Sequence, residues 1–126
     1  MNLNQVTLPA INIAESVAFY EGLGFRLIVL AAPRYARFEC PEGDATFSIE
    51  LAEDLPTRTG VVLYFECDNL DEKVASLQER GYIFEQLPRD EPWLWREARL
   101  RDPSANVLCL YHAGENRRFP PWRIKA

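Results

Sequence analysis

Hydrophobic and polar positions alternate between residues 4 and 11, which predicts a strand with one buried face. Apolar residues at helical spacing follow between residues 13 and 20. Asn12 precedes this segment and Gly24 follows it, and both are typical of helix caps. Three more strand-like runs, separated by turn signals, complete the first half: residues 26–30, 35–40 and 45–51.

The second half of the chain repeats this order at a constant offset of 57 residues. A single insertion in either half would break this constant offset, so its persistence predicts two copies of one module, a strand and a helix followed by three strands. Asn69 is expected to cap the second helix. Strands are expected at residues 61–67, 82–85, 96–102 and 106–111. The equivalent positions are Gln5 and Val62, Asn12 and Asn69, Gly24 and Gly81, and Phe25 and Tyr82.

A chain of 126 residues is long enough for one domain with a shared core and short for two independent ones. We expect module one at residues 3–52, a linker at 53–59 and module two at 60–113. Residues 114–126 are expected to form an ordered C-terminal extension that is not helical.

The charge balance excludes several classes of partner. The chain has 14 basic and 19 acidic residues, a net charge of −5, which disfavours nucleic acid and anionic membrane surfaces.

The apolar runs of the chain fall short of the roughly 20 residues that a membrane span needs. Cys40, Cys67 and Cys109 show no C-x-x-C spacing, so neither a disulfide framework nor a zinc knuckle is expected. We expect a cytoplasmic protein.

Two motifs resemble one known family. They are the Phe19–Phe25 sequence FYEGLGF and the pattern R-D-P-x-x-N-x-L at Arg101–Leu108. Together they resemble the vicinal oxygen chelate superfamily, the group of glyoxalase I, bleomycin resistance proteins, fosfomycin-modifying enzymes and extradiol dioxygenases. The resemblance covers residues 3 to about 113 and implies an α+β fold. In that fold, two tandem βαβββ modules form curled mixed sheets around a cavity, usually within a homodimer.

The resemblance also indicates where a metal would bind. The family's metal enzymes place ligands on the first and last strands of each module, and the corresponding positions here are Gln5, Glu50, Val62 and Cys109. Gln5 and Glu50 carry oxygen donors, whereas Val62 has none. We therefore expect no catalytic metal and no other cofactor, with a divalent metal disfavoured.

The same strands predict the side chains of the cavity. If Val62 faces the cavity, strand alternation puts Tyr64 and Glu66 there as well. The same parity adds four residues of the later strands: Arg99, Val107, Cys109 and Tyr111.

The segment Glu91–Arg99 is unusual because it contains two tryptophans. Trp93 and Trp95 either stack on a flat ligand or cover the end of a sheet. Arg96 or Arg99 is suited to grip a carboxylate or phosphate, although Arg99 is also a candidate for an internal ion pair with Glu50 or Glu66.

Cys109 has two interpretations. A nucleophilic thiol needs a base, and His112 lies three residues further along, on the other face of that strand. A buried inert thiol is the other interpretation.

Three functions are compatible with these residues. The first is a protein of the bleomycin-resistance type that binds a small flat or anionic ligand in a dimer cavity without a catalytic metal. The alternative is a glyoxalase-type lyase or isomerase, either metal-dependent through Gln5 and Glu50 or metal-free with Glu50 as general base. The third is a scaffold module whose cavity is filled by its own side chains.

Overall fold

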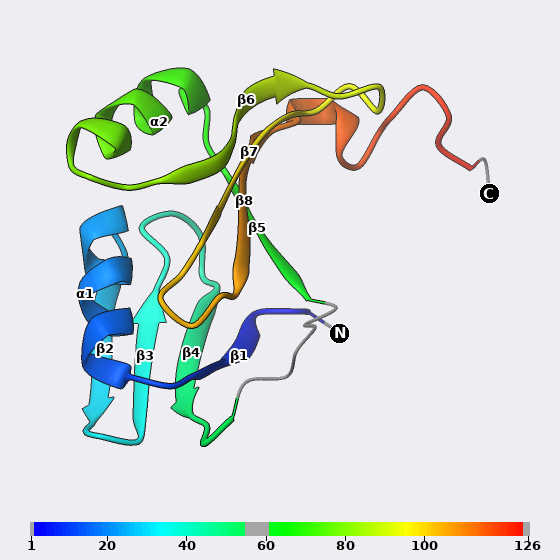
Figure 1. Cartoon of the computed structure of the whole chain (residues 1–126). Helices are drawn as coiled ribbons and strands as arrows, with labels where there is room; N and C mark the ends of the chain where they lie inside the picture. Colours follow the sequence, from blue (N-terminus) through cyan, green and yellow to red (C-terminus); the bar gives the residue numbers. More distant parts are fainter. Residues whose placement is uncertain (1, 55–60, 125–126) are drawn as a thin grey trace. The chain divides into compact units, whose positions relative to one another are not determined.

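A computed structural model of the protein describes residues 2–54 and 61–124. Most of the predicted linker, and the end of the predicted C-terminal extension, lie outside the described residues. The chain divides into two compact units (Figure 1). Unit 1 spans Met1–Gly60 and includes Asp102–Asn106, and unit 2 spans Val61–Arg101 and Val107–Ala126.

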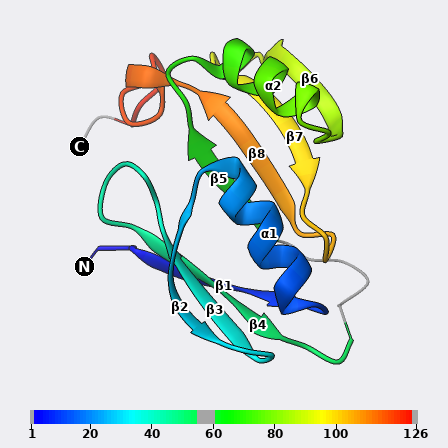
Figure 2. The ribbon, with the colours of Figure 1, turned by 90° about the vertical axis from the view of Figure 1, so that its left-hand side faces the viewer.

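Unit 1 is a four-stranded mixed sheet with one helix. The sheet has the order β1-β4-β3-β2, in which β1 and β4 are parallel and the other pairs are antiparallel. Figure 2 shows α1 lying along one face of this sheet. The elements are β1 (Gln5–Ala10), α1 (Ile13–Leu23), β2 (Arg26–Ala31), β3 (Tyr35–Glu39) and β4 (Thr46–Leu51).

The predicted caps of α1 are confirmed. The Asn12 side chain accepts a hydrogen bond from the Glu15 backbone N–H at 2.9 Å. Gly24 ends the helix with φ of 109°, a left-handed conformation that glycine adopts without steric cost. The helix therefore begins and ends where its sequence dictates.

Aromatic rings fill the space between α1 and its sheet. Tyr20 and Phe38 are fully buried, and the Phe47 ring lies 4.8 Å from the Tyr20 ring and 5.1 Å from the Phe38 ring. Because strand side chains alternate, the opposite face of β4 carries Ser48 and Glu50. That face is polar.

Unit 2 repeats the same arrangement. Its sheet has the order β5-β8-β7-β6, with β5 and β8 parallel and the other pairs antiparallel. The buried face of α2 presents Leu70, Val74 and Leu77. The elements are β5 (Val62–Glu66), α2 (Leu70–Glu79), β6 (Phe84–Asp90), β7 (Arg96–Arg101), β8 (Val107–His112) and a short 3-10 helix, η1 (Gly114–Asn116).

Three local predictions for the second half need correction. The strand expected at 82–85 is β6, which continues to Asp90 because an edge strand tolerates Pro88 and the irregular pairing around it. Asn69 takes the N-cap position of α2, but its side chain makes no cap hydrogen bond. The extension expected to lack helix begins with η1, whose single turn is stabilised by backbone bonds such as Asn116 N–H to Ala113 O.

The predicted fold class is confirmed: the protein is α+β and consists of two tandem βαβββ modules. Within the described parts of the chain, no helix has the length and apolar character needed to cross a membrane.

Candidate functional site

Three strands of unit 2 carry polar and aromatic side chains on the sheet face opposite α2. The register sets Tyr64 beside Cys109, and Cys109 beside Arg99. Two residues further along, Glu66 lies beside Tyr111. Strand alternation puts all five on one face, and this face is the candidate site.

Glu97 is the most buried charge on this face, and it is absent from the predicted site residues. Its side chain is 2% exposed. Oε2 accepts a 2.6 Å hydrogen bond from Trp93 Nε1, and Oε1 accepts a 3.1 Å bond from Arg99 Nη2. The Cys109 thiol lies 3.6 Å from Oε1. A buried carboxylate is costly without such donors. The one signal in the sequence is its spacing of two from Arg99, which places both on one strand face.

Arg99 is the charge partner of Glu97, whereas the sequence suggested Glu50 or Glu66 for an internal pair. Its guanidinium also donates to the Tyr64 hydroxyl at 3.3 Å and lies 5.9 Å from the centre of that ring. Partial burial acts to lower the pKa of Arg99, but the hydrogen bonds with Glu97 and Tyr64 outweigh it and raise the pKa. Arg99 is therefore a permanent cation that neutralises Glu97.

The environment of Cys109 favours an inert thiol. The residue is fully buried. Burial, aided by the negative charge of Glu97, raises the pKa of the Cys109 thiol to about 12. A nucleophilic cysteine requires the thiolate near neutral pH, and this environment disfavours it.

Aromatic rings form the walls of the site. Trp95 stacks on Tyr111 with ring centres 4.9 Å apart, and Tyr64 meets both rings edge-on. Trp93 lies in the turn between β6 and β7, where its indole is fixed by the bond to Glu97. The rings of Tyr64, Trp93 and Trp95, together with the C-terminal extension, line a pocket of about 320 Å³, and Tyr111 supports Trp95 from outside this lining. The residues that line it are Tyr64, Trp93, Trp95, Glu97, Asn116, Arg117, Pro120 and Trp122.

Glu66 positions the extension that forms one wall of this pocket. One of its oxygens accepts hydrogen bonds from the backbone N–H groups of Ala113 and Gly114, both at 2.8 Å. Burial alone would raise the pKa of Glu66, but these two bonds lower it below its ordinary value. Further along, Trp95 Nε1 donates to the Asn116 carbonyl at 3.3 Å. Glu66 thus acts on the pocket through the extension.

Arg96 lies on the opposite face of β7 from Arg99. Its Nε and Nη2 donate to the two carboxylate oxygens of Asp71 on α2, at 2.8 and 3.1 Å. Nη1 donates to Asp90 at 3.1 Å. The structure thus separates the two candidate arginines: Arg99 lies at the aromatic pocket, whereas Arg96 joins α2 to the sheet edge.

In unit 1, the two candidate metal ligands share a sheet face but lie apart along it. Gln5 pairs with Thr46 in the parallel ladder, whereas Glu50 pairs with Pro9. This separation of four strand residues corresponds to about 13 Å. The Gln5 amide is also engaged, because Nε2 donates to Ser48 Oγ at 2.8 Å and Oε1 accepts from the Thr46 hydroxyl.

The donors of unit 2 fit a metal no better. Val62 has no donor atom, and Cys109 pairs with Tyr64, two residues further along the strand. Over residues 2–54 and 61–124, no three His, Cys, Asp or Glu side chains are grouped as a metal site would require. The donor set of each unit therefore does not fit the metal site of the family that the sequence resembles.

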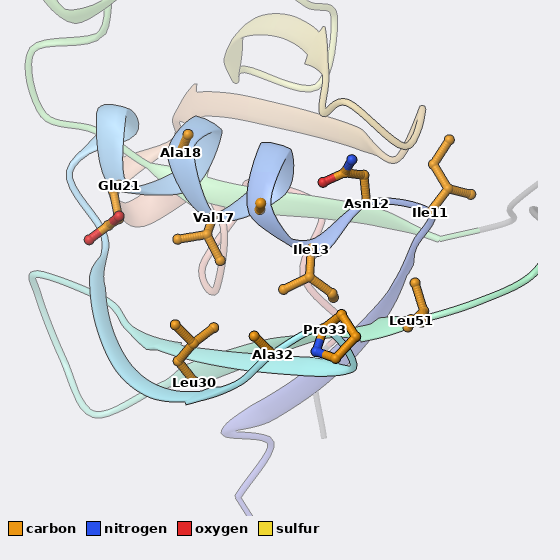
Figure 3. A pocket seen from close by; sticks show the side chains of 11 residues that line it. Ile11, Asn12, Ile13, Val17, Ala18, Glu21, Leu30, Ala32, Pro33 and Leu51 are labelled. Carbon is orange, nitrogen blue, oxygen red and sulfur yellow. The ribbon is translucent and has the colours of Figure 1, made fainter.

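A larger hollow, of about 490 Å³, lies in unit 1 beside α1. Figure 3 shows Ile13 and Val17 of α1 pointing toward Leu30, Ala32 and Pro33. Most of its lining is apolar, with Asn12 and Glu21 as the polar residues, so it offers few groups to orient a ligand. The smaller pocket of unit 2 combines aromatic rings with a buried, ion-paired carboxylate, and we take it as the candidate functional site.

Comparisons with known proteins agree with this fold. Residues 2–110 match the family model described as Glyoxalase/Bleomycin resistance protein/Dioxygenase superfamily. A solved glyoxalase/bleomycin resistance protein/dioxygenase from Nocardioides aligns with a TM-score of 0.80 at 20% identity, covering 99% of this chain and 90% of that chain.

Two further solved structures have the same fold. A bleomycin-binding protein complexed with bleomycin aligns with a TM-score of 0.73 at 21% identity, covering 89% of this chain and 98% of that one. A lactoylglutathione lyase from Agrobacterium tumefaciens aligns with a TM-score of 0.73 at 17% identity, covering 88% of this chain and 92% of that one. A search of curated proteins gives no match. At these identities, the structural likeness extends to the fold alone.

Proposed function

The chain belongs to the glyoxalase, bleomycin resistance protein and dioxygenase superfamily, and on that premise we propose that it binds a small, flat, anionic molecule in the pocket of unit 2. The observation that carries the proposal is the combination of aromatic walls with the buried Glu97 carboxylate, whose charge is neutralised by the half-buried Arg99. A pocket of about 320 Å³ lies within the range of small-molecule sites. This space favours a binding protein over a scaffold filled by its own side chains.

The aromatic walls account for the flat ligand. Trp93 and Trp122 are 43% and 58% exposed, so both indoles retain free surface for a ring to cover. Trp95 is held behind them by Tyr111 and by the bond to Asn116. Stacking of one ring on such a platform contributes about 0.5–1.5 kcal/mol beyond the area that it buries.

The charges account for the anion. Glu97 is already paired with Arg99, so the two side chains together add no net charge to the site. Arg117 adds a guanidinium to the pocket wall. A guanidinium binds a carboxylate through two parallel hydrogen bonds. A cationic ligand would meet the positive charge of Arg117 and is disfavoured.

Calorimetric titration with 2-naphthoate tests this function. We expect saturable binding and a raised melting temperature. Cyclohexanecarboxylate, which has the charge without the flat ring, and 2-naphthylmethanol, which has the ring without the charge, should both bind more weakly. Arg117→Gln should weaken naphthoate binding about tenfold, whereas Arg26→Gln on the surface of unit 1 should leave it unchanged. Equal binding of all three compounds, or of none, would contradict the proposal.

We also propose that the protein works as a cytoplasmic homodimer without a catalytic metal. Cys40 and Cys109 carry free thiols, which suits a reducing compartment. The donor sets of the two units support the absence of a catalytic ion. Sedimentation velocity and metal analysis of the purified protein test these points, and a monomer or a stoichiometric metal would contradict them.

A further inference from the structure

The polar face of the unit 1 sheet carries a hydrogen-bonded chain of side chains from three adjacent strands. Arg37 Nε donates to the Tyr35 hydroxyl at 2.9 Å, and that hydroxyl lies 2.6 Å from Ser48 Oγ. Ser48 Oγ accepts a further bond from Gln5 Nε2 at 2.8 Å. The strand register brings these side chains together, because Ser48 of β4 lies between Arg37 of β3 and Thr7 of β1. The chain therefore depends on pairing between distant parts of the sequence.

A count of hydrogens shows that this network is incomplete. Tyr35 and Ser48 each bring one hydroxyl hydrogen, and the single bond between them uses one of the two. The other bonds of these hydroxyls are supplied by Arg37 and Gln5, which are donors. Whichever way the hydroxyls turn, one hydrogen finds no acceptor among the described residues. Ser48 is fully buried, so its hydrogen is best placed on the Tyr35 oxygen, which leaves the spare hydrogen on the half-buried Tyr35 hydroxyl.

Arg37 brings further unused donors to the same place. Its Nε is occupied by Tyr35, and its guanidinium carbon lies 5.6 Å from the centre of that ring. Within residues 2–54 and 61–124, its terminal nitrogens have no carboxylate within ion-pair distance. By contrast, Arg26 on the same sheet face is paired with Glu39 at 3.3 Å. Arg37 is half-buried, so its orientation is restrained by the sheet.

We propose that this network is a carboxylate-binding site on unit 1, separate from the aromatic pocket of unit 2. The two terminal nitrogens of Arg37 match the two oxygens of a carboxylate, and the spare hydroxyl hydrogen of Tyr35 or Ser48 supplies a third donor. The free groups of the network itself, the guanidinium of Arg37 and one hydroxyl hydrogen, are donors, which favours an oxyanion over a metal cation, although the Glu50 carboxylate lies on the same face beside Tyr35. The network thus occupies the sheet face on which the sequence offered Gln5 as a metal ligand.

The ionisation of Tyr35 agrees with this geometry. The hydrogen bond with Ser48, supported by the charge and hydrogen bond of Arg37, holds the pKa of Tyr35 below its ordinary value. The nearby Glu50 carboxylate acts in the opposite direction. Its register position beside Tyr35 makes Glu50 the group that would repel a bound anion and so limit affinity.

Titration with succinate, an aliphatic dicarboxylate that lacks a flat ring, tests the site. We expect saturable binding by calorimetry and a matching shift of the Arg37 Nε signal in nuclear magnetic resonance spectra. Arg37→Lys keeps the charge but removes the two-pronged geometry and should weaken binding about tenfold. Tyr35→Phe should weaken binding about fivefold, the loss of one hydrogen bond.

Arg26→Lys is the matched control, because it changes an arginine of the same sheet face that already has a partner. It should leave succinate binding unchanged. Equal losses in Arg26→Lys and Arg37→Lys, succinate binding abolished by a chelator, or no saturable binding by the intact protein would overturn the proposal. Naphthoate binding should survive Arg37→Lys, so failure of this site is distinguishable from failure of the aromatic pocket.

Discussion

The hydroxyl of Tyr20, in α1, donates a 2.7 Å hydrogen bond to Oδ2 of Asp102, 82 positions later in the chain. Both side chains are buried, at 0% and 4% exposure. The Asp102 carboxylate also accepts from the backbone N–H groups of Ser104 and Asn106 and from Asn106 Nδ2. The Asn106 amide in turn donates to the Pro9 carbonyl. One carboxylate therefore organises the turn Asp102–Asn106, which belongs to unit 1, and joins it to α1.

Tyr20→Phe is expected to lower the free energy of unfolding by about 1–3 kcal/mol, because a buried carboxylate loses one donor. Denaturation by urea measures this loss. Glu39→Gln, which breaks an exposed ion pair of the same unit, is the control and should change stability by less than about 0.5 kcal/mol. Similar effects of both substitutions would mean that the Tyr20–Asp102 bond contributes nothing specific.

Two tyrosines of unit 1 should respond to alkaline pH in opposite ways. Burial, together with Asp102, raises the pKa of Tyr20 far above 10, so its stabilising contribution is complete below pH 10 and is lost as the pH rises further. The pKa of Tyr35 is lowered, so its ionisation favours the folded state above pH 10, and that contribution is lost as the pH falls through the folded pKa. Ultraviolet titration of tyrosinate should show Tyr35→Phe losing an early step. Loss of the early step in Tyr20→Phe instead would reverse the assignment.

The fold was predictable because its signals are local. Asn12 and Gly24 cap α1 as their types predict, and strand alternation correctly put Arg99 on the face of Cys109. The site was less predictable because its contacts depend on register and rotamer. Glu97 is a strand glutamate without any distinguishing motif, and only the structure brings the Trp93 indole to it.

The same limit applies to unit 1. The contact of Gln5 with Ser48 joins residues 43 positions apart, and no local pattern predicts it. For Arg96, the residue type suggested a ligand-binding role. Its position on the other face of β7 instead places its guanidinium beside Asp71 and Asp90. The residue types therefore suggested candidate site residues, and the strand pairing in the structure decides which of them lie together.

Glu97→Gln should expose the electrostatic role of the buried carboxylate. Loss of the charge leaves Arg99 without its partner, and we expect the free energy of unfolding to fall by about 1–3 kcal/mol. The pKa of Cys109 should also fall from about 12, because the negative charge contributes to its rise. Thiolate absorbance as a function of pH measures this shift. Glu85→Gln, which breaks the exposed pair with Arg101, should change neither quantity.

Glu66→Gln should loosen the wall of the aromatic pocket without breaking the sheet. The neutral amide accepts less strongly from the N–H groups of Ala113 and Gly114, so we expect faster hydrogen exchange at those two amides. Because the pKa of Glu66 is lowered, its contribution is complete above about pH 4.5 and is lost as the pH falls through the folded pKa. Because the intrinsic exchange rate itself falls in acid, protection factors are compared: those of the two amides in the intact protein should decrease as the pH falls through the folded pKa, and Glu66→Gln should remove that decrease. Unchanged exchange at both amides in the variant would show that the extension is held by other contacts, such as the bond of Trp95 to Asn116.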